Sequence, residues 1–159
     1  MSMEEIRPPD SLRLDCPKPR LFLAGSIEMG KAVDWQAAVT QALADIDVLI
    51  CNPRRAAWDA GWPQDIDFAP FREQVEWELE ALERADLIVF YFAPDTKSPI
   101  TLLELGLHAR RNILVCCPQG FWRKGNIDIV CRRYGITQVD TLEGLIARTK
   151  DALAALPIR

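Results

Sequence analysis

The sequence predicts an α/β fold in which helices cover both faces of a parallel sheet. Short apolar runs rich in β-branched residues alternate along the chain with longer segments of helical spacing. One run, residues 86–92 (DLIVFYF), shows no alternation of polar and apolar residues, which indicates a strand buried on both sides. Alternating strands and helices form parallel sheets with right-handed crossovers. We therefore predict a flavodoxin-like, doubly wound, five-stranded parallel sheet in a three-layer α/β/α arrangement.

The predicted strands and helices follow one another in a simple order. The strands are expected at residues 20–25, 47–51, 86–92, 112–117 and 135–139. The helices are expected at residues 32–44, 71–85, 99–111 and 141–156. Ser98 and Pro99 suit the cap and the first residue of the third helix. Residues 1–19, polar and proline-rich, are expected to be an extended arm, and residues 20–159 a single domain.

The helix at residues 71–85 has a clear pattern of apolar and acidic residues. The apolar members recur at helical spacing and are expected to face the core: Phe71, Val75, Leu79 and Leu82. The acidic members form a separate stripe, expected to face solvent: Glu73, Glu76, Glu80 and Glu83.

The composition excludes several classes of function. Proteins bind polymeric nucleic acid largely because basic side chains release counterions from the phosphate backbone. A chain with a formal net charge of −4 gains little from this effect, so we expect no polymeric nucleic acid partner. No apolar run approaches the length of a membrane span, and the polar N-terminus lacks the apolar stretch of a signal peptide. We therefore expect a cytoplasmic location and no membrane partner. The five cysteines include no CxxC pair and His108 is the only histidine, so we expect buried free thiols and no metal site.

Polar and aromatic residues gather after the ends of the predicted strands. In an open parallel sheet, ligands bind outside the carboxyl ends of the strands. The candidate binding residues there are Gly25, Ser26, Trp58, Asp59, Trp62, Ser98 and Asn126. Four loops therefore converge on one edge of the sheet, and we predict a ligand site at that edge.

Two of these loops have more than one interpretation. GSIEMG, after the first strand, is neither a GxGxxG fingerprint nor a P-loop, and Glu28 would point a negative charge into an anion site. A tight turn that needs glycine, or a neutral sugar or base against the Gly25 backbone, fits this loop better. Asp59 stands between Trp58 and Trp62, where it suits a stacked flat ligand. An ordinary Asx turn is the alternative.

Glu104 is the strongest single candidate for catalysis. It lies inside the predicted helix 99–111 among leucines, and an unpaired carboxylate is costly to bury. Either it pairs with His108 four residues later on an exposed helix edge, or it is held for chemistry. Asp86, at the head of the third strand, suits a cap or a turn after the preceding helix.

Four segments together resemble one known family. They are FLAGSIEMG after the first strand, ADLIVFYFAPD at the third strand, SPITLLELG on the next helix and KGN near Asn126. In this order and spacing they resemble the nucleoside 2-deoxyribosyltransferase family and its nucleotide-hydrolysing relatives. The resemblance covers residues 20–126, most of the predicted domain.

The resemblance implies roles for single residues. Glu104 takes the place of the nucleophilic glutamate, and Asp86 that of the aspartate that handles the base and its proton. Ser98 falls on a position that contacts a sugar hydroxyl or a phosphate. Asn126 matches an asparagine that relatives lend to a neighbouring subunit, which implies a homo-oligomer with shared sites. The implied chemistry requires no cofactor and no metal.

Two positions depart from the family pattern. Phe22 stands where many relatives have a tyrosine, so that hydroxyl is missing, and Tyr91 or a loop residue is the candidate replacement. Ser98 resembles the serine of the nucleotide hydrolases, yet these carry a basic residue where this chain has Glu28. Because a misplaced charge costs more than a versatile hydroxyl, Glu28 favours deoxynucleosides that carry no phosphate.

The predicted function is transfer of 2-deoxyribose between nucleobases, in nucleoside salvage, through a covalent deoxyribosyl ester on Glu104. The partners would be a small deoxynucleoside and a free nucleobase. An N-glycoside hydrolase acting on a nucleoside or nucleotide is one alternative, because water can attack the same ester. A non-catalytic nucleotide-binding module is another, because sheets of this type also serve as binding domains.

Overall fold

Within residues 2–28, 32–55 and 59–157, which a computed structural model describes, six strands form one parallel sheet. Their order across the sheet is β1-β3-β2-β4-β5-β6. The strands are β1 (Glu4–Ile6), β2 (Arg20–Gly25), β3 (Leu49–Cys51), β4 (Leu87–Tyr91), β5 (Ile113–Cys116) and β6 (Thr137–Val139). The helices are α1 (Trp35–Ala42), α2 (Ala69–Arg84), α3 (Pro99–His108), α4 (Lys124–Tyr134) and α5 (Leu142–Ala154). The predicted α/β class and parallel sheet are confirmed.

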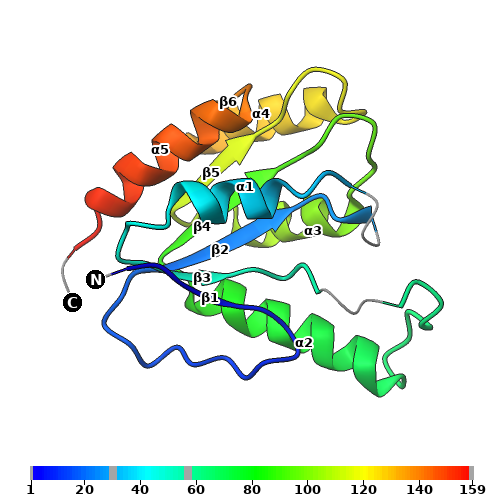
Figure 1. Ribbon diagram of the computed structural model, residues 1–159. Helices are drawn as coiled ribbons and strands as arrows, with labels where there is room; N and C mark the ends of the chain where they lie inside the picture. Colours follow the sequence, from blue (N-terminus) through cyan, green and yellow to red (C-terminus); the bar gives the residue numbers. More distant parts are fainter. Residues whose placement is uncertain (1, 29–31, 56–58, 158–159) are drawn as a thin grey trace.

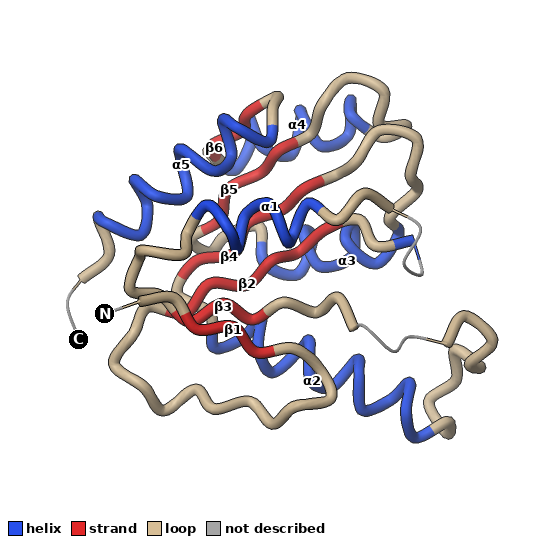
Figure 2. Tube along the Cα trace, in the orientation of Figure 1, coloured by secondary structure: helices blue, strands red, loops and turns tan. Residues whose placement is uncertain are grey.

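Helices cover both faces of the sheet and give three layers (Figures 1 and 2). α1 and α5 pack over one face, where Leu21 and Trp35 belong to one apolar core. α2, α3 and α4 cover the opposite face, where Phe22 and Leu105 belong to a second core. Neighbouring residues of β2 thus point into different cores, which is why the central strands have no polar face.

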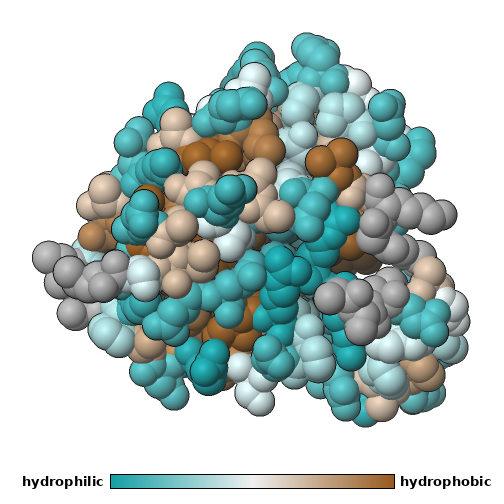
Figure 3. All heavy atoms as spheres, in the orientation of Figure 1, coloured by the Kyte–Doolittle hydropathy of each residue, from teal (hydrophilic) through white to brown (hydrophobic). Residues whose placement is uncertain are grey.

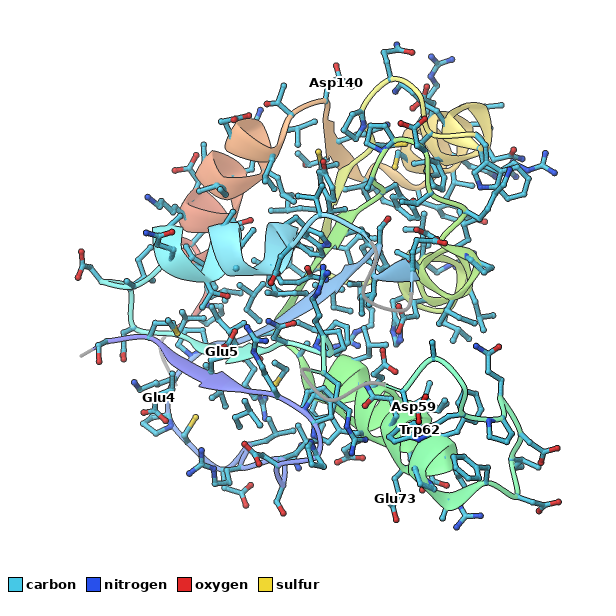
Figure 4. All side chains as sticks on the ribbon, turned by 45° about the vertical axis from the view of Figure 1, so that its right-hand side comes forward. Glu4, Glu5, Asp59, Trp62, Glu73 and Asp140 are labelled. Carbon is cyan, nitrogen blue, oxygen red and sulfur yellow. The ribbon has the colours of Figure 1, made fainter. Side chains whose placement is uncertain are left out.

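The predicted count of five strands is one too few. β1 pairs in parallel with β3 at the margin of the sheet, with Glu4 opposite Leu49. It comes from the segment predicted as an extended arm, and Glu4 and Glu5 lie along it (Figure 4). Its sequence, EEI, lacks the apolar run of a central strand, but short charged strands are typical of sheet edges. The Glu5 carboxylate also accepts a hydrogen bond from Nδ2 of Asn52 at 3.1 Å, which ties β1 to the loop after β3.

Two helices differ from the prediction. α4 lies outside every predicted helix, and its first residues are the KGN segment. In α2 the side chains of Gln74, Ala81 and Leu82 are buried, whereas Leu79, predicted to face the core, is exposed. The prediction for Leu79 is wrong, because the buried line of α2 includes the polar Gln74, which an apolar pattern does not reveal.

The cysteines are in the state that the absence of a CxxC pair predicts. All five cysteines are free thiols, and all except Cys16 are buried. In the described part of the chain, no helix has both the length and the apolar character needed to cross a membrane.

Candidate active site

Gly25 and Ser26 close the carboxyl end of β2 in a tightly packed corner. A Cβ atom on Gly25 would lie 2.4 Å from Cζ2 of Trp35 and 2.6 Å from the carbonyl oxygen of Tyr91, so only glycine fits. The indole Nε1 of Trp35 donates to the carbonyl oxygen of Ser26 at 3.2 Å. This packing fixes the direction in which the Ser26 side chain leaves the strand.

Three hydroxyl groups form a cluster beside this corner. Oγ of Ser26 lies 2.6 Å from Oγ of Ser98 and 3.0 Å from Oγ1 of Thr96, and the latter two atoms are 2.9 Å apart. Ser26 and Ser98 are both buried. The Ala93 amide donates to Oγ of Ser26 at 2.9 Å. The structure thus brings together the predicted Ser26 and Ser98 in this hydroxyl cluster and adds Thr96 to them.

The carboxylate of Glu28 caps the loop that leads into α3. Its Oε1 accepts hydrogen bonds from the backbone amides of Ser98 at 2.8 Å and Lys97 at 3.1 Å. Ser98 is the cap residue, as predicted, but its own side chain makes no capping bond and belongs to the hydroxyl cluster. Glu28, Asp95 and Ser98 have φ values of 47°, 64° and 46°. This corner therefore concentrates backbone strain, a common property of functional sites.

Glu104 lies buried in α3, with only 7% of its surface exposed. Burial raises the pKa of the Glu104 carboxyl well above its usual range, and the charge of Glu78 raises it further. His108, the alternative partner expected from the sequence, instead has Nδ1 3.4 Å from Nη1 of Arg111. A buried carboxyl group with a strongly raised pKa, on a helix that begins at the hydroxyl cluster, marks a candidate catalytic group.

Glu78, on α2, is a second carboxyl group of this site that the sequence-based candidates do not include. Burial raises its pKa to about 7, against the opposing effect of a hydrogen bond with Gln74. Because Glu78 and Glu104 interact, their protons titrate as those of a pair. The sequence does carry a signal, since Gln74, Glu78, Ala81 and Ala85 recur at helical spacing.

The comparisons with known proteins identify the family. Residues 18–121 match the family described as "Nucleoside 2-deoxyribosyltransferase like". The chain belongs to this family. The fold is similar to that of a "conserved protein from Enterococcus faecalis V583", solved by crystallography, with a TM-score of 0.57 and 14% identity over 84% of this chain and 98% of that one. No curated protein matches the chain.

In this member of the nucleoside 2-deoxyribosyltransferase-like family, Asp86 lies at the sheet edge opposite the hydroxyl cluster. It directly precedes β4, whereas Ser26 directly follows β2, and the two strands are parallel. Oδ2 of Asp86 accepts from the backbone amide of Arg20 at 2.7 Å and from its Nε at 3.3 Å. The role at the base that the resemblance assigns to Asp86 stays a prediction, and this position does not support it.

We expect Asp86→Asn to lower stability while base exchange continues. The amide keeps an oxygen for the Arg20 backbone but removes the ion pair, whose two side chains are 16% and 21% exposed. At that exposure the free energy of unfolding should fall by about 1 kcal/mol, measured by urea denaturation. A loss of exchange on the order of 100-fold in a folded variant would return Asp86 to a catalytic role.

Asp59 and Trp62 lie beside the start of α2, in the loop that follows β3 (Figure 4). Oδ1 of Asp59 accepts from the Gly61 amide at 2.8 Å, which is the Asx turn expected as the alternative. The guanidinium of Arg55 lies 4.9 Å from the centre of the Trp62 ring, so one ring face is covered. Trp58, also predicted to bind substrate, lies outside the described residues.

The remaining predicted positions fall on different surfaces. Asn126 is exposed in the first turn of α4. Phe22 is buried on the sheet face that also holds Leu105, whereas Tyr91 packs against Trp35 on the opposite face. Tyr91 therefore supplies no hydroxyl at the position of Phe22. Within the described residues, no group of three or more His, Cys, Asp or Glu side chains is placed to hold a metal ion.

Proposed function

We propose that this protein transfers 2-deoxyribose from one nucleobase to another, with Glu104 as the nucleophile at C1′. The observation that carries the proposal is Glu104, a carboxyl group buried in α3 that interacts with the half-buried Glu78 of α2, on the same sheet face. Retaining glycosyl transfer uses such a pair, one group as nucleophile and the other as acid and base. Membership in the nucleoside 2-deoxyribosyltransferase-like family supports the same chemistry.

The proposed reaction has two displacements. In the first, the Glu104 carboxylate forms a bond to C1′ while the bond between C1′ and the base nitrogen breaks, and protonated Glu78 gives its proton to the leaving base. This leaves a deoxyribosyl ester on Glu104, a free base and an ionised Glu78. In the second, a nitrogen of the acceptor base attacks C1′, its proton passes to Glu78, and the Glu104 carboxylate is released. Two inversions at C1′ restore the starting configuration.

Glu78 takes the proton-transfer role that the resemblance assigns to Asp86. Its pKa of about 7 allows it to hold and release a proton near neutral pH, and it interacts with Glu104. Asp86 instead engages Arg20 at the amino edge of the sheet. The hydroxyl cluster would hold the sugar through Ser98, with the Gly25 backbone and Ser26 behind it.

Product analysis tests this function. The protein is incubated with a 2′-deoxynucleoside, with and without a second nucleobase, and the products are separated by chromatography. Transfer predicts a new deoxynucleoside that forms only when the acceptor is present. Free base and deoxyribose in both samples would support an N-glycoside hydrolase, the alternative that the serine at position 98 favours. Binding of the deoxynucleoside without either product would indicate a non-catalytic module.

A second copy of the chain is proposed to complete the site through Asn126. The site helix α3 and the neighbouring helix in sequence, α4, carry apolar side chains that are more than half exposed. These are Ile100, Leu103, Leu107 and Ile129. By contrast, the face that carries α1 and α5 is hydrophilic over most of its area, with small separate apolar patches (Figure 3). An apolar stripe of this kind on the site helix suits contact between copies.

We expect the wild-type protein to sediment as a homo-oligomer, and Leu103→Glu combined with Leu107→Glu to sediment as a monomer. Burying the introduced charges in an apolar interface would be too costly. Val33→Glu, at a side chain 76% exposed before α1, is the matched control and should stay oligomeric. Asn126→Ala should keep the oligomer but lower exchange by about tenfold, as expected for one lost polar contact. A fully active wild-type monomer would contradict the shared site.

A further inference from the structure

Gln74, on α2, makes a buried contact that bears on the second carboxyl group of the site. We infer that Gln74 is a positioning residue, whose side-chain amide holds the carboxylate of Glu78 and favours its ionised form. The inference rests on the proposed function, in which Glu78 transfers the proton of the base. The fixed direction of the amide, the neighbours of Glu78 and an unpaired amide oxygen each support it.

The side chain of Gln74 is fixed in direction by the loop after β3. It is only 6% exposed, and its Nε2 donates to the carbonyl oxygen of Pro53 at 3.1 Å. A carbonyl oxygen can only accept, so the nitrogen end of the amide must face it. The amide cannot turn its oxygen toward Pro53 without losing this buried hydrogen bond. The nitrogen carries a second hydrogen, which is left for another acceptor.

Glu78 is the acceptor that we assign to this second hydrogen. Residues four apart on a helix share one face, and Gln74 and Glu78 have this spacing on α2. The hydrogen bond between the two side chains lowers the pKa of Glu78, against the larger effect of burial. A donor lowers the pKa of a carboxyl group because it stabilises the carboxylate rather than the acid. Gln74 therefore helps Glu78 to release its proton near neutral pH.

The carboxyl group that interacts with Glu78 acts in the opposite direction. It belongs to Glu104 on α3, and like charges disfavour the ionisation of both groups. In the part of the chain that the structure describes, no lysine or arginine forms an ion pair with Glu78. Of its described neighbours, Gln74 is the one that stabilises the Glu78 carboxylate. Without this donor, Glu78 would be a weaker acid toward the leaving base.

An unpaired oxygen indicates that Gln74 is not retained for stability. Its Oε1 is buried and has no hydrogen-bond partner among the described residues. A buried acceptor without a donor costs free energy. Methionine, of similar length, would remove this cost and lose the bond to Pro53, two effects that oppose each other. We therefore expect Gln74→Met to change the melting temperature little, which separates a positioning role from a structural one.

The test measures the pH dependence of base exchange and the titration of Glu78 in Gln74→Met. Loss of one hydrogen bond to the carboxylate should move the alkaline limb of kcat/KM to higher pH by about one unit. In an NMR titration of the glutamate carboxyl carbons, the Glu78 signal, identified by its absence from Glu78→Gln, should move by a similar amount. Gln138→Met is the matched control, because Nε2 of Gln138 donates to the carboxylate of Asp128, on α4, at 2.6 Å.

Wild type and Gln138→Met should share one pH profile, whereas in Gln74→Met the alkaline limb and the Glu78 titration should move together. Gln74→Asn keeps the amide but withdraws it by one carbon. It should shift both in the same direction, and it serves as the second variant if Gln74→Met does not fold. An unchanged Glu78 titration in a folded Gln74 variant, or an equal shift in the control, would overturn the inference. A shifted titration without any base exchange would contradict only the proposed function, and exchange with an unchanged titration only this inference.

Discussion

Glu104→Gln is expected to abolish base exchange while the protein stays folded. The substitution is nearly isosteric and removes the carboxylate that bonds to C1′, so kcat should fall by about 10³-fold or more. Exchange is measured with a preparation free of wild-type protein, and Glu143→Gln serves as the folded control. Near-normal exchange by the folded variant would remove Glu104 from the role of nucleophile.

The same variant should change how stability depends on pH. Burial raises the pKa of Glu104 in the folded state, so between the unfolded and folded pKa values the native protein binds more protons than the unfolded chain. Wild-type stability should therefore be greatest below the unfolded pKa and fall as pH rises through the folded pKa. Glutamine cannot ionise, so Glu104→Gln should lose this part of the decline. Thermal unfolding of both proteins from about pH 5 to pH 9 tests whether the stability of wild type falls more steeply with pH than that of Glu104→Gln. Parallel plots of melting temperature against pH would contradict this expectation.

Glu78→Gln is expected to slow exchange by about 10²- to 10⁴-fold, the usual contribution of a positioned acid and base. The pair must hold one proton for the first displacement, with Glu104 ionised and Glu78 protonated. The wild-type rate should therefore rise as the first carboxyl group ionises and fall as the second does. Glu78 is protonated and uncharged while Glu104 ionises, so the acid limb should remain in Glu78→Gln. The alkaline limb, which follows loss of the Glu78 proton, should disappear.

Two measurements separate this role from a structural one. The substitution Glu78→Gln should lower the exchange rate less for nucleosides whose base is a good leaving group, because such a base needs less protonation to depart. Asp86→Asn, a second carboxylate-to-amide change, should leave the pH profile in place. A pH profile of Glu78→Gln that matches wild type would show that the proton comes from another group.

The parts of the fold that were predicted correctly are those with an apolar signal. The central strands have unpatterned apolar sequences because helices bury them from both sides. Glu104 could be selected as a candidate because its neighbours in the sequence are leucines, and it is buried. β1 carries two glutamates in three residues and is a strand only because the edge of β3 accepts it. Its pairing depends on residues more than forty positions away, which no local pattern contains.

The site was harder to predict because its carboxyl groups do not follow the apolar pattern. In α2 the apolar pattern placed Leu79 on the inner face, but Leu79 is exposed, whereas Gln74 is buried and Glu78 is half-buried. Asp86 was placed from a motif alone, although its position before β4 already puts it at the amino edge of the sheet. Topology therefore argues against the role at the base that the family pattern assigns to Asp86, and that role stays a prediction.

The pairing of β1 with β3 bears on how the protein avoids aggregation. β3 is three residues long and wholly buried, and an unpaired strand margin of this kind recruits strands from other chains. The family-matched residues 18–121 contain the four inner strands, while both outer strands, β1 and β6, lie beyond them. A chain trimmed to the matched residues would keep Glu78 and Glu104 but present two bare sheet margins. Protection against sheet-to-sheet association therefore resides in segments that the shared region of the family does not include.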